Sequence, residues 1–107
     1  MDKSTFDQYV LQTYKRVPLT LVKGEGMRVW DDAGNEYLDF FPGWGAGNLG
    51  HCHPSVVAAV RAQAEKIMHI PNVYYNELQG KLAQLLVASS FDGQVFFCNS
   101  GAEANEG

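Results

Sequence analysis

The first half of the chain alternates apolar and polar side chains over three short stretches. These are residues 19–22, 27–30 and 36–40, and the intervening segments, 23–26 and 31–35, carry glycine, aspartate and asparagine. A period of two places alternate side chains on opposite faces of a strand. Because turn residues separate the stretches by only a few positions, we predict a small antiparallel meander.

Three other segments carry apolar residues at the spacing of an α-helix. We expect helices over residues 4–14, 55–69 and 77–89. Val17-Pro18 is expected to end the first helix, and Pro54 suits the first turn of the second. The third helix has an apolar stripe that we expect to face a core, formed by Leu78, Leu82, Leu85 and Leu86. A short extended segment, residues 73–75, is predicted before it.

The last residues combine a predicted buried strand, a turn of small residues and the start of a helix. The strand is residues 94–98, Gln-Val-Phe-Phe-Cys, and residues 99–106 read Asn-Ser-Gly-Ala-Glu-Ala-Asn-Glu. The first N–H groups of a helix have no partner inside it, and the helix dipole adds positive potential there. We therefore predict an anion site, suited to a phosphate, at this turn.

Ser100 and Glu103 also match a capping box, in which a hydroxyl and a carboxylate satisfy backbone N–H groups. That structural role does not account for Gly101, because glycine in the first turn lowers helix stability. The sequence lacks both the Gly-x-x-x-x-Gly-Lys-Ser/Thr loop and a dinucleotide-binding Gly-x-Gly-x-x-Gly after a strand. A cap and a phosphate site therefore remain compatible interpretations of the same turn.

A glycine-rich loop, residues 41–50, separates the predicted meander from the second helix. It contains four glycines and Pro42 around one tryptophan, Trp44. Such a loop is either a flexible linker or a segment that approaches a ligand or another subunit closely. Phe41 and Trp44 favour the second interpretation, because large aromatic residues are uncommon in linkers.

Composition narrows the class of protein. The 107 residues are 46% hydrophobic and carry 8 basic and 12 acidic side chains, for a net charge of −4. This balance is typical of a globular protein and disfavours nucleic-acid binding. No apolar run is long enough to span a membrane, and the low cysteine content leads us to expect a cytoplasmic protein. Cys52 and Cys98 permit one disulfide, although a cysteine-poor chain favours free thiols, and the spacing of His51-Cys52-His53 does not support a metal site.

The predicted order of elements is typical of the opening of an α/β domain. After the meander come helix, helix, strand, anion turn and helix, so the chain holds one strand of the expected central sheet. One strand makes no sheet, and the last helix extends for only about two turns, which is too short for stability in isolation. We therefore expect the sequence to be an N-terminal piece of a longer protein.

The turn at residues 99–106 resembles the cofactor-phosphate turn of the class-III aminotransferases, the pyridoxal-phosphate enzymes of fold type I. Three further segments agree with that family in order and spacing, and they are residues 26–40, 48–54 and 72–77. The resemblance implies an α/β fold of that type, truncated. Residues 1–50 would belong to the N-terminal helix and meander of the small domain, and residues 51–107 would begin the large cofactor-binding domain.

The resemblance also implies site residues. Ser100, Gly101 and Ala102 match the turn that holds the phosphate of pyridoxal 5'-phosphate, with Gly101 and Ala102 donating backbone N–H groups. Trp44 and Tyr75 match positions that line the substrate pocket. Trp44 departs from the tyrosine or aliphatic residue that relatives carry there, and the residue-level alternative for Tyr75 is a core aromatic beside Tyr74.

The family further implies a Schiff-base lysine, an acid near the cofactor ring and a carboxylate-binding arginine, all expected downstream of this chain. No lysine here matches, so no catalytic residue is assigned and the chain by itself is expected to be inactive. The implied activity moves the terminal amino group of N-acetylornithine to 2-oxoglutarate in arginine biosynthesis, in a homodimer. Alternatives are another ω-aminotransferase, acting on ornithine or 4-aminobutyrate, and a non-catalytic phosphate-binding or interaction module.

Overall fold

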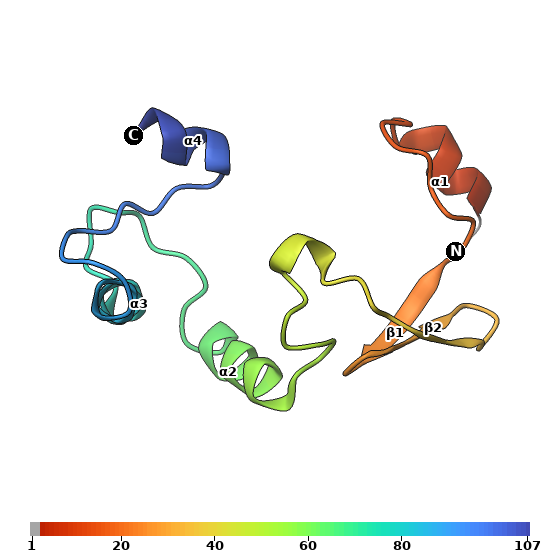
Figure 1. Cartoon of the computed structure of the whole chain (residues 1–107), viewed down its shortest axis with the longest axis horizontal. Helices are drawn as coiled ribbons and strands as arrows, with labels where there is room; N and C mark the ends of the chain where they lie inside the picture. The colour runs from red at the N-terminus through yellow and green to blue at the C-terminus, as the bar shows by residue number, and fades with distance from the viewer. Residues whose placement is uncertain (1–2) are drawn as a thin grey trace. The chain divides into compact units, whose positions relative to one another are not determined.

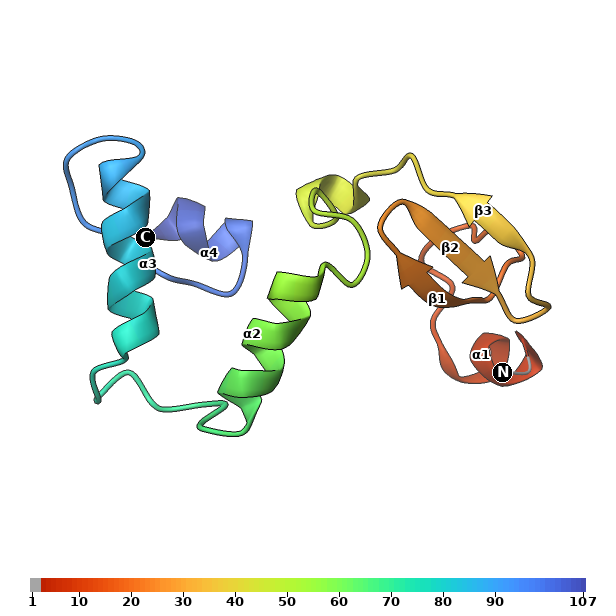
Figure 2. The same cartoon turned by 90° about the horizontal axis from the view of Figure 1, so that it is seen from below.

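The computed structural model describes residues 3–107 (Figures 1 and 2). Its elements are α1 (Lys3–Tyr9), β1 (Leu21–Glu25), β2 (Arg28–Asp31), β3 (Glu36–Leu38), the 3-10 helix η1 (Gly43–Gly45), α2 (Pro54–Ala64), α3 (Glu77–Ala88) and α4 (Gly101–Glu106). The chain divides into two compact units, one up to Lys66 and one from Ile67 onward. Among the described residues no helix is both long and apolar enough to cross a membrane.

The predicted meander is present in the first unit as a three-stranded antiparallel sheet in the order β1-β2-β3. Gly24 pairs with Val29, and Val29 pairs in turn with Tyr37. The first strand lies later than expected, because residues 23–25 continue it and do not form a turn. The reversal is confined to Gly26 and Met27, and Gly26 supplies the left-handed backbone, with φ of 56°, that a tight reversal requires.

Asp31 organises the connection between β2 and β3. Its carboxylate accepts hydrogen bonds from the backbone N–H groups of Ala33 (3.0 Å) and Asn35 (2.8 Å), and from the side chains of Asn35 and Tyr37 (both 2.9 Å). These bonds, led by the Asn35 side chain, lower the pKa of Asp31 to about 2. Asp31 and Val29 are each only 6% exposed, so the buried part of the meander is in β2, whereas the turn residues 32–35 are exposed.

The helix at the N-terminus is shorter than the prediction of residues 4–14. It ends at Tyr9, well before Val17-Pro18, so the expectation that this dipeptide ends it is wrong. Past Tyr9 the chain turns, and Thr13 donates its backbone N–H to the carbonyl of Leu11. Side chains stabilise this turn, because Gln12 donates to Asp7 at 2.8 Å and the Arg16 guanidinium lies 4.8 Å from the ring centroid of Phe6.

The second helix begins at Pro54 as expected but ends at Ala64, about a turn before residue 69. Its end tightens, since Lys66 donates to the carbonyl of Gln63 in a 3-10 pattern. The residues that follow it, including β-branched Ile67 and the pre-proline Ile70, favour helix weakly.

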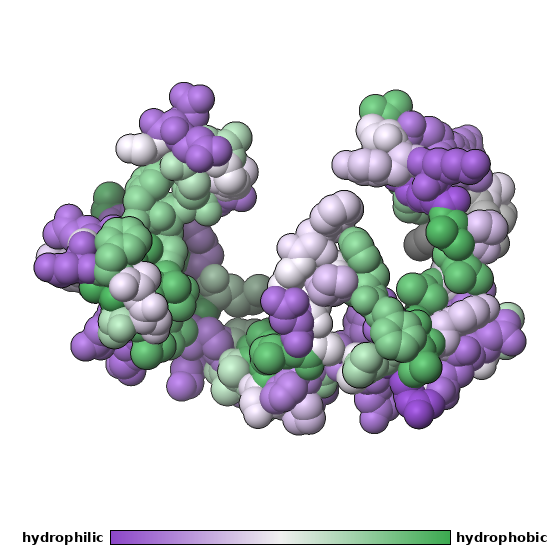
Figure 3. All heavy atoms as spheres, viewed as in Figure 1, coloured by the Kyte–Doolittle hydropathy of each residue, from purple (hydrophilic) through white to green (hydrophobic). Residues whose placement is uncertain are grey.

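The third helix matches its prediction within one residue, but its apolar stripe does not face a core. Leu78, Leu82, Leu85 and Leu86 are 44–64% exposed, whereas Ala83 and Val87 are the half-buried positions. The surface view shows apolar side chains over α2 and over α3 (Figure 3). The described residues of the second unit therefore supply no layer that covers this stripe.

Two extended predictions in the second unit are wrong. Residues 71–74 form a turn, closed by a hydrogen bond from the Tyr74 N–H to the Pro71 carbonyl at 3.1 Å. Residues 94–98 are not assigned as a strand, because the described residues offer no neighbouring strand to pair with them. The exposure of their side chains still alternates as in a strand, since Val95 and Phe97 are half-buried and Phe96 is 68% exposed.

Candidate functional site

The turn at the start of α4 is built as a capped helix N-terminus. Ser100 has extended backbone angles and its hydroxyl accepts the N–H of Glu103 at 3.2 Å. The Glu103 carboxylate reaches back and accepts the N–H of Asn99 at 2.6 Å. The predicted capping box is therefore present, with one difference: its carboxylate bonds to the residue before the cap instead of the cap itself.

This difference leaves a run of backbone donors at the turn. Within the described residues, no hydrogen bond engages the N–H groups of Ser100, Gly101 or Ala102, while the next two N–H groups of the helix are bonded to Ser100. A Cβ added at Gly101 would meet no atom within 4 Å. The turn therefore offers three consecutive donors and open space beside them, an arrangement that suits the oxygens of a phosphate.

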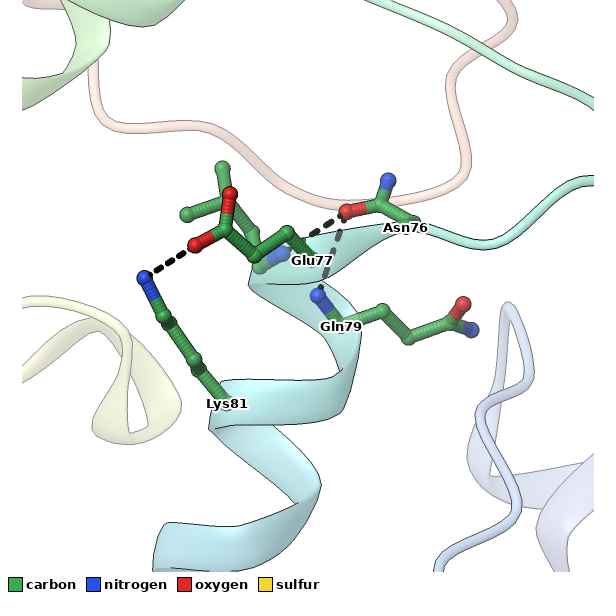
Figure 4. Close-up of polar contacts among 5 residues, drawn as sticks. Asn76, Glu77, Gln79 and Lys81 are labelled. Atoms are coloured by element: carbon green, nitrogen blue, oxygen red, sulfur yellow. Dashed lines mark hydrogen bonds and ion pairs between the residues drawn. The ribbon is translucent and has the colours of Figure 1, made fainter.

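The segment that leads to this turn runs along α3. Two shallow surface cavities lie between this segment and α3. One, of about 360 Å³, lies between the first turns of α3, the preceding 70–76 turn and Phe97, and the other lies between Val87 on α3 and Val95. Asn76 caps α3, accepting the N–H groups of Leu78 (3.0 Å) and Gln79 (3.2 Å), so the helix start is fixed (Figure 4).

Tyr75, immediately before that cap, is fully exposed at 105%, and its neighbour Tyr74 is 67% exposed. Within the described residues neither ring is buried. Tyr75 and the Ser100–Ala102 turn both belong to the second unit, whereas Trp44 belongs to the first.

The glycine-rich loop, residues 41–50, is folded and internally hydrogen-bonded. The Pro42 carbonyl accepts the N–H groups of Gly45 (3.0 Å) and Gly47 (2.9 Å), and Gly50 donates to Gly47 at 2.9 Å. The loop contains η1, and at its tip Trp44 is 93% exposed with a left-handed backbone, φ of 57°. The Phe41 ring meets the Trp44 ring edge-to-face at 5.3 Å.

Sequence reasoning missed the residues that close this loop at its base. His51 exchanges backbone hydrogen bonds with Gly26 at 2.8 and 2.9 Å, and its Nε2 lies 2.7 Å from Oδ2 of Asp39. The hydrogen bond with His51 lowers the pKa of Asp39 below its ordinary value, with help from the Phe41 N–H. In the sequence, His51 is notable only as part of the His51-Cys52-His53 triplet. No local pattern predicts its contact with Asp39, twelve residues away.

Two lysines of the described residues lie near carboxylates. Lys81 on α3 pairs with Glu77 (Figure 4), and Lys23 lies near Glu25 with its Nζ 4.2 Å from the ring centroid of Trp30. Cys52 and Cys98 are both free and exposed. The Cys98 thiol lies 3.4 Å from the carbonyl oxygen of Ser100, to which it donates.

Known proteins similar to this chain were identified through sequence and structure. The family model described as "Aminotransferase class-III" matches residues 9–107. An acetylornithine aminotransferase of Caldanaerobacter subterraneus is 56% identical over 94% of this chain and 25% of its own length. One from Thermosynechococcus vestitus is 57% identical over 94% of this chain and 24% of its own. The chain thus spans about a quarter of the length of the curated relatives it matches.

Solved structures give the same result for the fold. The acetylornithine aminotransferase of Elizabethkingia anophelis is 35% identical, with a TM-score of 0.89 over 97% of this chain and 27% of its own. The ornithine aminotransferase of Toxoplasma gondii ME49 is 39% identical, with a TM-score of 0.88 over 97% of this chain and 24% of its own. The meander and helices therefore have the fold of part of a fold type I pyridoxal-phosphate transferase, and the chain belongs to the class-III aminotransferase family.

Proposed function

We propose that this chain is the N-terminal quarter of an aminotransferase that moves the terminal amino group of N-acetylornithine to 2-oxoglutarate, in arginine biosynthesis. The observation that carries the proposal is the identity of 56% and 57%, over nearly the whole chain, to two acetylornithine aminotransferases. Among the solved structures the identities overlap, because two ornithine aminotransferases from Toxoplasma gondii are 38% and 39% identical and the acetylornithine aminotransferases of Elizabethkingia anophelis and Stenotrophomonas maltophilia are 35% and 43% identical. The choice of donor therefore rests on the curated relatives.

The cofactor of the proposed enzyme is pyridoxal 5'-phosphate, and the turn at α4 fits its phosphate. Ser100, Gly101 and Ala102 would hold the phosphate through backbone N–H groups that have no other partner in the described residues. Glu103 contributes indirectly, because its carboxylate and the Ser100 hydroxyl lock the turn. When bound, the cofactor supplies an electron sink for the carbon that carries the amino group.

Trp44 and Tyr75 are proposed to line the pocket for the amino donor.

 Both side chains are almost fully exposed in the described residues, Trp44 at 93% and Tyr75 at 105%, so each ring is free to contact a ligand or another part of the enzyme. Because Trp44 is bulkier than an aliphatic residue, it would narrow the range of donors by shape. We further propose that the enzyme is a cytoplasmic homodimer and that its small domain includes residues 1–50, with the large domain starting at residue 51.

The 107 residues alone are proposed to transfer no amino group. Their five lysines are Lys3, Lys15, Lys23, Lys66 and Lys81. None of them neighbours the α4 turn in sequence, and we assign the cofactor-binding lysine to the remainder of the enzyme. A self-contained binding module is disfavoured, because Val29 and Asp31 are the only buried side chains among the described residues.

The test is an assay of the full-length protein that contains this chain. Purified holoenzyme is given 2-oxoglutarate with N-acetylornithine, ornithine or 4-aminobutyrate, and glutamate formation is measured. We expect the highest kcat/KM with N-acetylornithine. A higher kcat/KM with ornithine or 4-aminobutyrate would show that N-acetylornithine is not the preferred donor. If none of the three donors gave glutamate, the proposed activity would be wrong.

A further inference from the structure

The loop at residues 41–50 leaves the meander and returns to it at the same place. Asp39, just before the loop, donates its backbone N–H to the carbonyl of Met27 at 2.8 Å. His51, just after it, forms an antiparallel bridge with Gly26. Both ends of the loop are therefore attached to the β1–β2 hairpin turn, and the ends lie close together as they do in a compact Ω-loop.

A side-chain contact joins the two ends across the base of the loop. His51 Nε2 and Asp39 Oδ2 are 2.7 Å apart, and the other oxygen of Asp39 accepts the N–H of Phe41 at 3.0 Å. One carboxylate thus holds both the residue that opens the loop and the residue that closes it. The Asp39 side chain is 27% exposed and that of His51 is 42% exposed, so the contact is partly shielded from water.

Two glycines make room for this contact. A Cβ at Gly24 would lie 2.6 Å from Cγ of His51, so the imidazole lies directly against the β1 backbone. A Cβ at Gly50 would lie 2.8 Å from the Gly26 carbonyl oxygen, and Gly50 has a φ of 76°. The close approach of the loop base to the hairpin therefore depends on positions where any side chain would collide.

The closed base supports a tip with an unfavourable backbone. Trp44 is a bulky residue with a left-handed conformation, which persists only where the surroundings enforce it, and its ring is almost fully exposed. No burial of the Trp44 ring in the described residues offsets that strain. A strained backbone at an exposed aromatic residue of a rigid loop indicates that the Trp44 ring is preorganised to contact a ligand or another part of the enzyme.

We propose that the Asp39–His51 pair is a positioning element that fixes the 41–50 loop and, through Trp44, sets the preference for the amino donor. The inference rests on the proposed function, because it takes Trp44 to line the donor pocket. His51 and Asp39 touch no substrate in this account. They act by holding the backbone that carries Trp44.

The experiment compares four variants of the full-length holoenzyme with the wild type. His51→Ala removes the contact, and Gly24→Ala displaces the imidazole while keeping His51. His51→Gln retains an amide nitrogen at the level of Nε2 and serves as the rescue. Lys81→Gln removes another exposed ion pair, with Glu77 on α3, and is the matched control.

For His51→Ala and Gly24→Ala we expect KM for N-acetylornithine to rise about tenfold while kcat changes much less, since a misplaced pocket residue weakens binding of the donor. The ratio of kcat/KM for N-acetylornithine to that for ornithine should fall, and cofactor content should stay unchanged. His51→Gln should recover most of the loss, and Lys81→Gln should match the wild type. Unchanged KM and donor ratio in both disrupting variants, or no recovery in His51→Gln, would overturn the proposal.

A second readout does not depend on the reaction. The N–H groups of Gly45, Gly47 and Gly50 are hydrogen-bonded inside the loop. Their hydrogen exchange should be faster in His51→Ala than in the wild type, while exchange in α3 stays the same. If the enzyme accepts none of the donors, the proposed function is wrong, but hydrogen exchange of the loop amides still tests the positioning role. Equal exchange in the two proteins would refute the positioning role even in an active enzyme.

Discussion

The meander with its loop and the helices of the second unit show two ways of making local structure. Between Leu21 and His51, backbone and side-chain hydrogen bonds join residues far apart in sequence, such as Asp39 with His51 and Gly26 with His51. In α3 and α4 the bonds are within a helical turn or at a cap. The meander and its loop are joined by contacts between distant residues, whereas the contacts of the helices are local. Apolar side chains stay exposed in both, as Leu21 at 55% and Leu82 at 48% show.

This difference matters for the candidate site. The Ser100–Ala102 turn is made almost entirely from backbone groups and one capping box, so its donors are set by short-range geometry. The Trp44 loop depends on contacts with a separate hairpin. A substitution should therefore act on the α4 turn by filling space, and on the loop by releasing its base.

The largest effect is expected from Gly101→Val. A branched side chain beside the three N–H groups would occupy the space left for a phosphate, so the purified full-length enzyme should lose nearly all bound cofactor. Cofactor content by absorbance measures this. Gly80→Ala is the control, because a Cβ there also meets no atom within 4 Å and alanine favours helix by about 1 kcal/mol. Full cofactor content in Gly101→Val would remove the turn from the site.

The next largest effect is expected at Asp31. Asp31→Ala leaves the N–H groups of Ala33 and Asn35 without their shared acceptor, and it also removes the acceptor for the side chains of Asn35 and Tyr37. Hydrogen exchange of the β2 and β3 amides should become much faster, while exchange in α3 is unaffected. The neighbouring Asp32→Ala, which changes an exposed carboxylate, is the matched control. Equal exchange in the two variants would mean that the Asp31 bonds do not hold the meander.

The same carboxylate gives the meander a pH dependence. The pKa of Asp31 is about 2 in the folded protein, below its ordinary value of 3.8. A lowered pKa contributes stability that is complete above about pH 5 and is lost as the pH falls toward 2. The difference in β2 exchange between wild type and Asp31→Asn should therefore shrink from pH 5 to pH 3. A difference that is constant over this range would contradict the lowered pKa.

The smallest effect is expected on the helical side, at the cap of α3. Asn76→Ala removes the acceptor for the N–H groups of Leu78 and Gln79, which should cost about 1 kcal/mol of helix stability. Exchange at those two amides is the measurement. Lys81→Gln, which affects one exposed ion pair, should cost less than about 0.5 kcal/mol. A larger loss of helix stability in Lys81→Gln than in Asn76→Ala would show that the cap is not the stronger of the two interactions.

The same contrast explains what could be predicted from the sequence. The α3 boundaries and the Ser100–Glu103 cap follow from residues a few positions apart, and so did the meander, whose strands are joined by short turns. The strand at residues 94–98 could not form from its own pattern, because a strand needs a partner that the described residues do not provide. The Asp39–His51 contact had no local signal, since it requires the loop to return to Gly26.

We propose that the Ser100–Ala102 turn binds the phosphate of the cofactor, and a crystal structure of the full-length protein with pyridoxal 5'-phosphate bound tests this directly. We expect phosphate oxygens within about 3 Å of the backbone nitrogens of Gly101 and Ala102. A phosphate bound elsewhere, with these two N–H groups bonded to other parts of the protein, would contradict it.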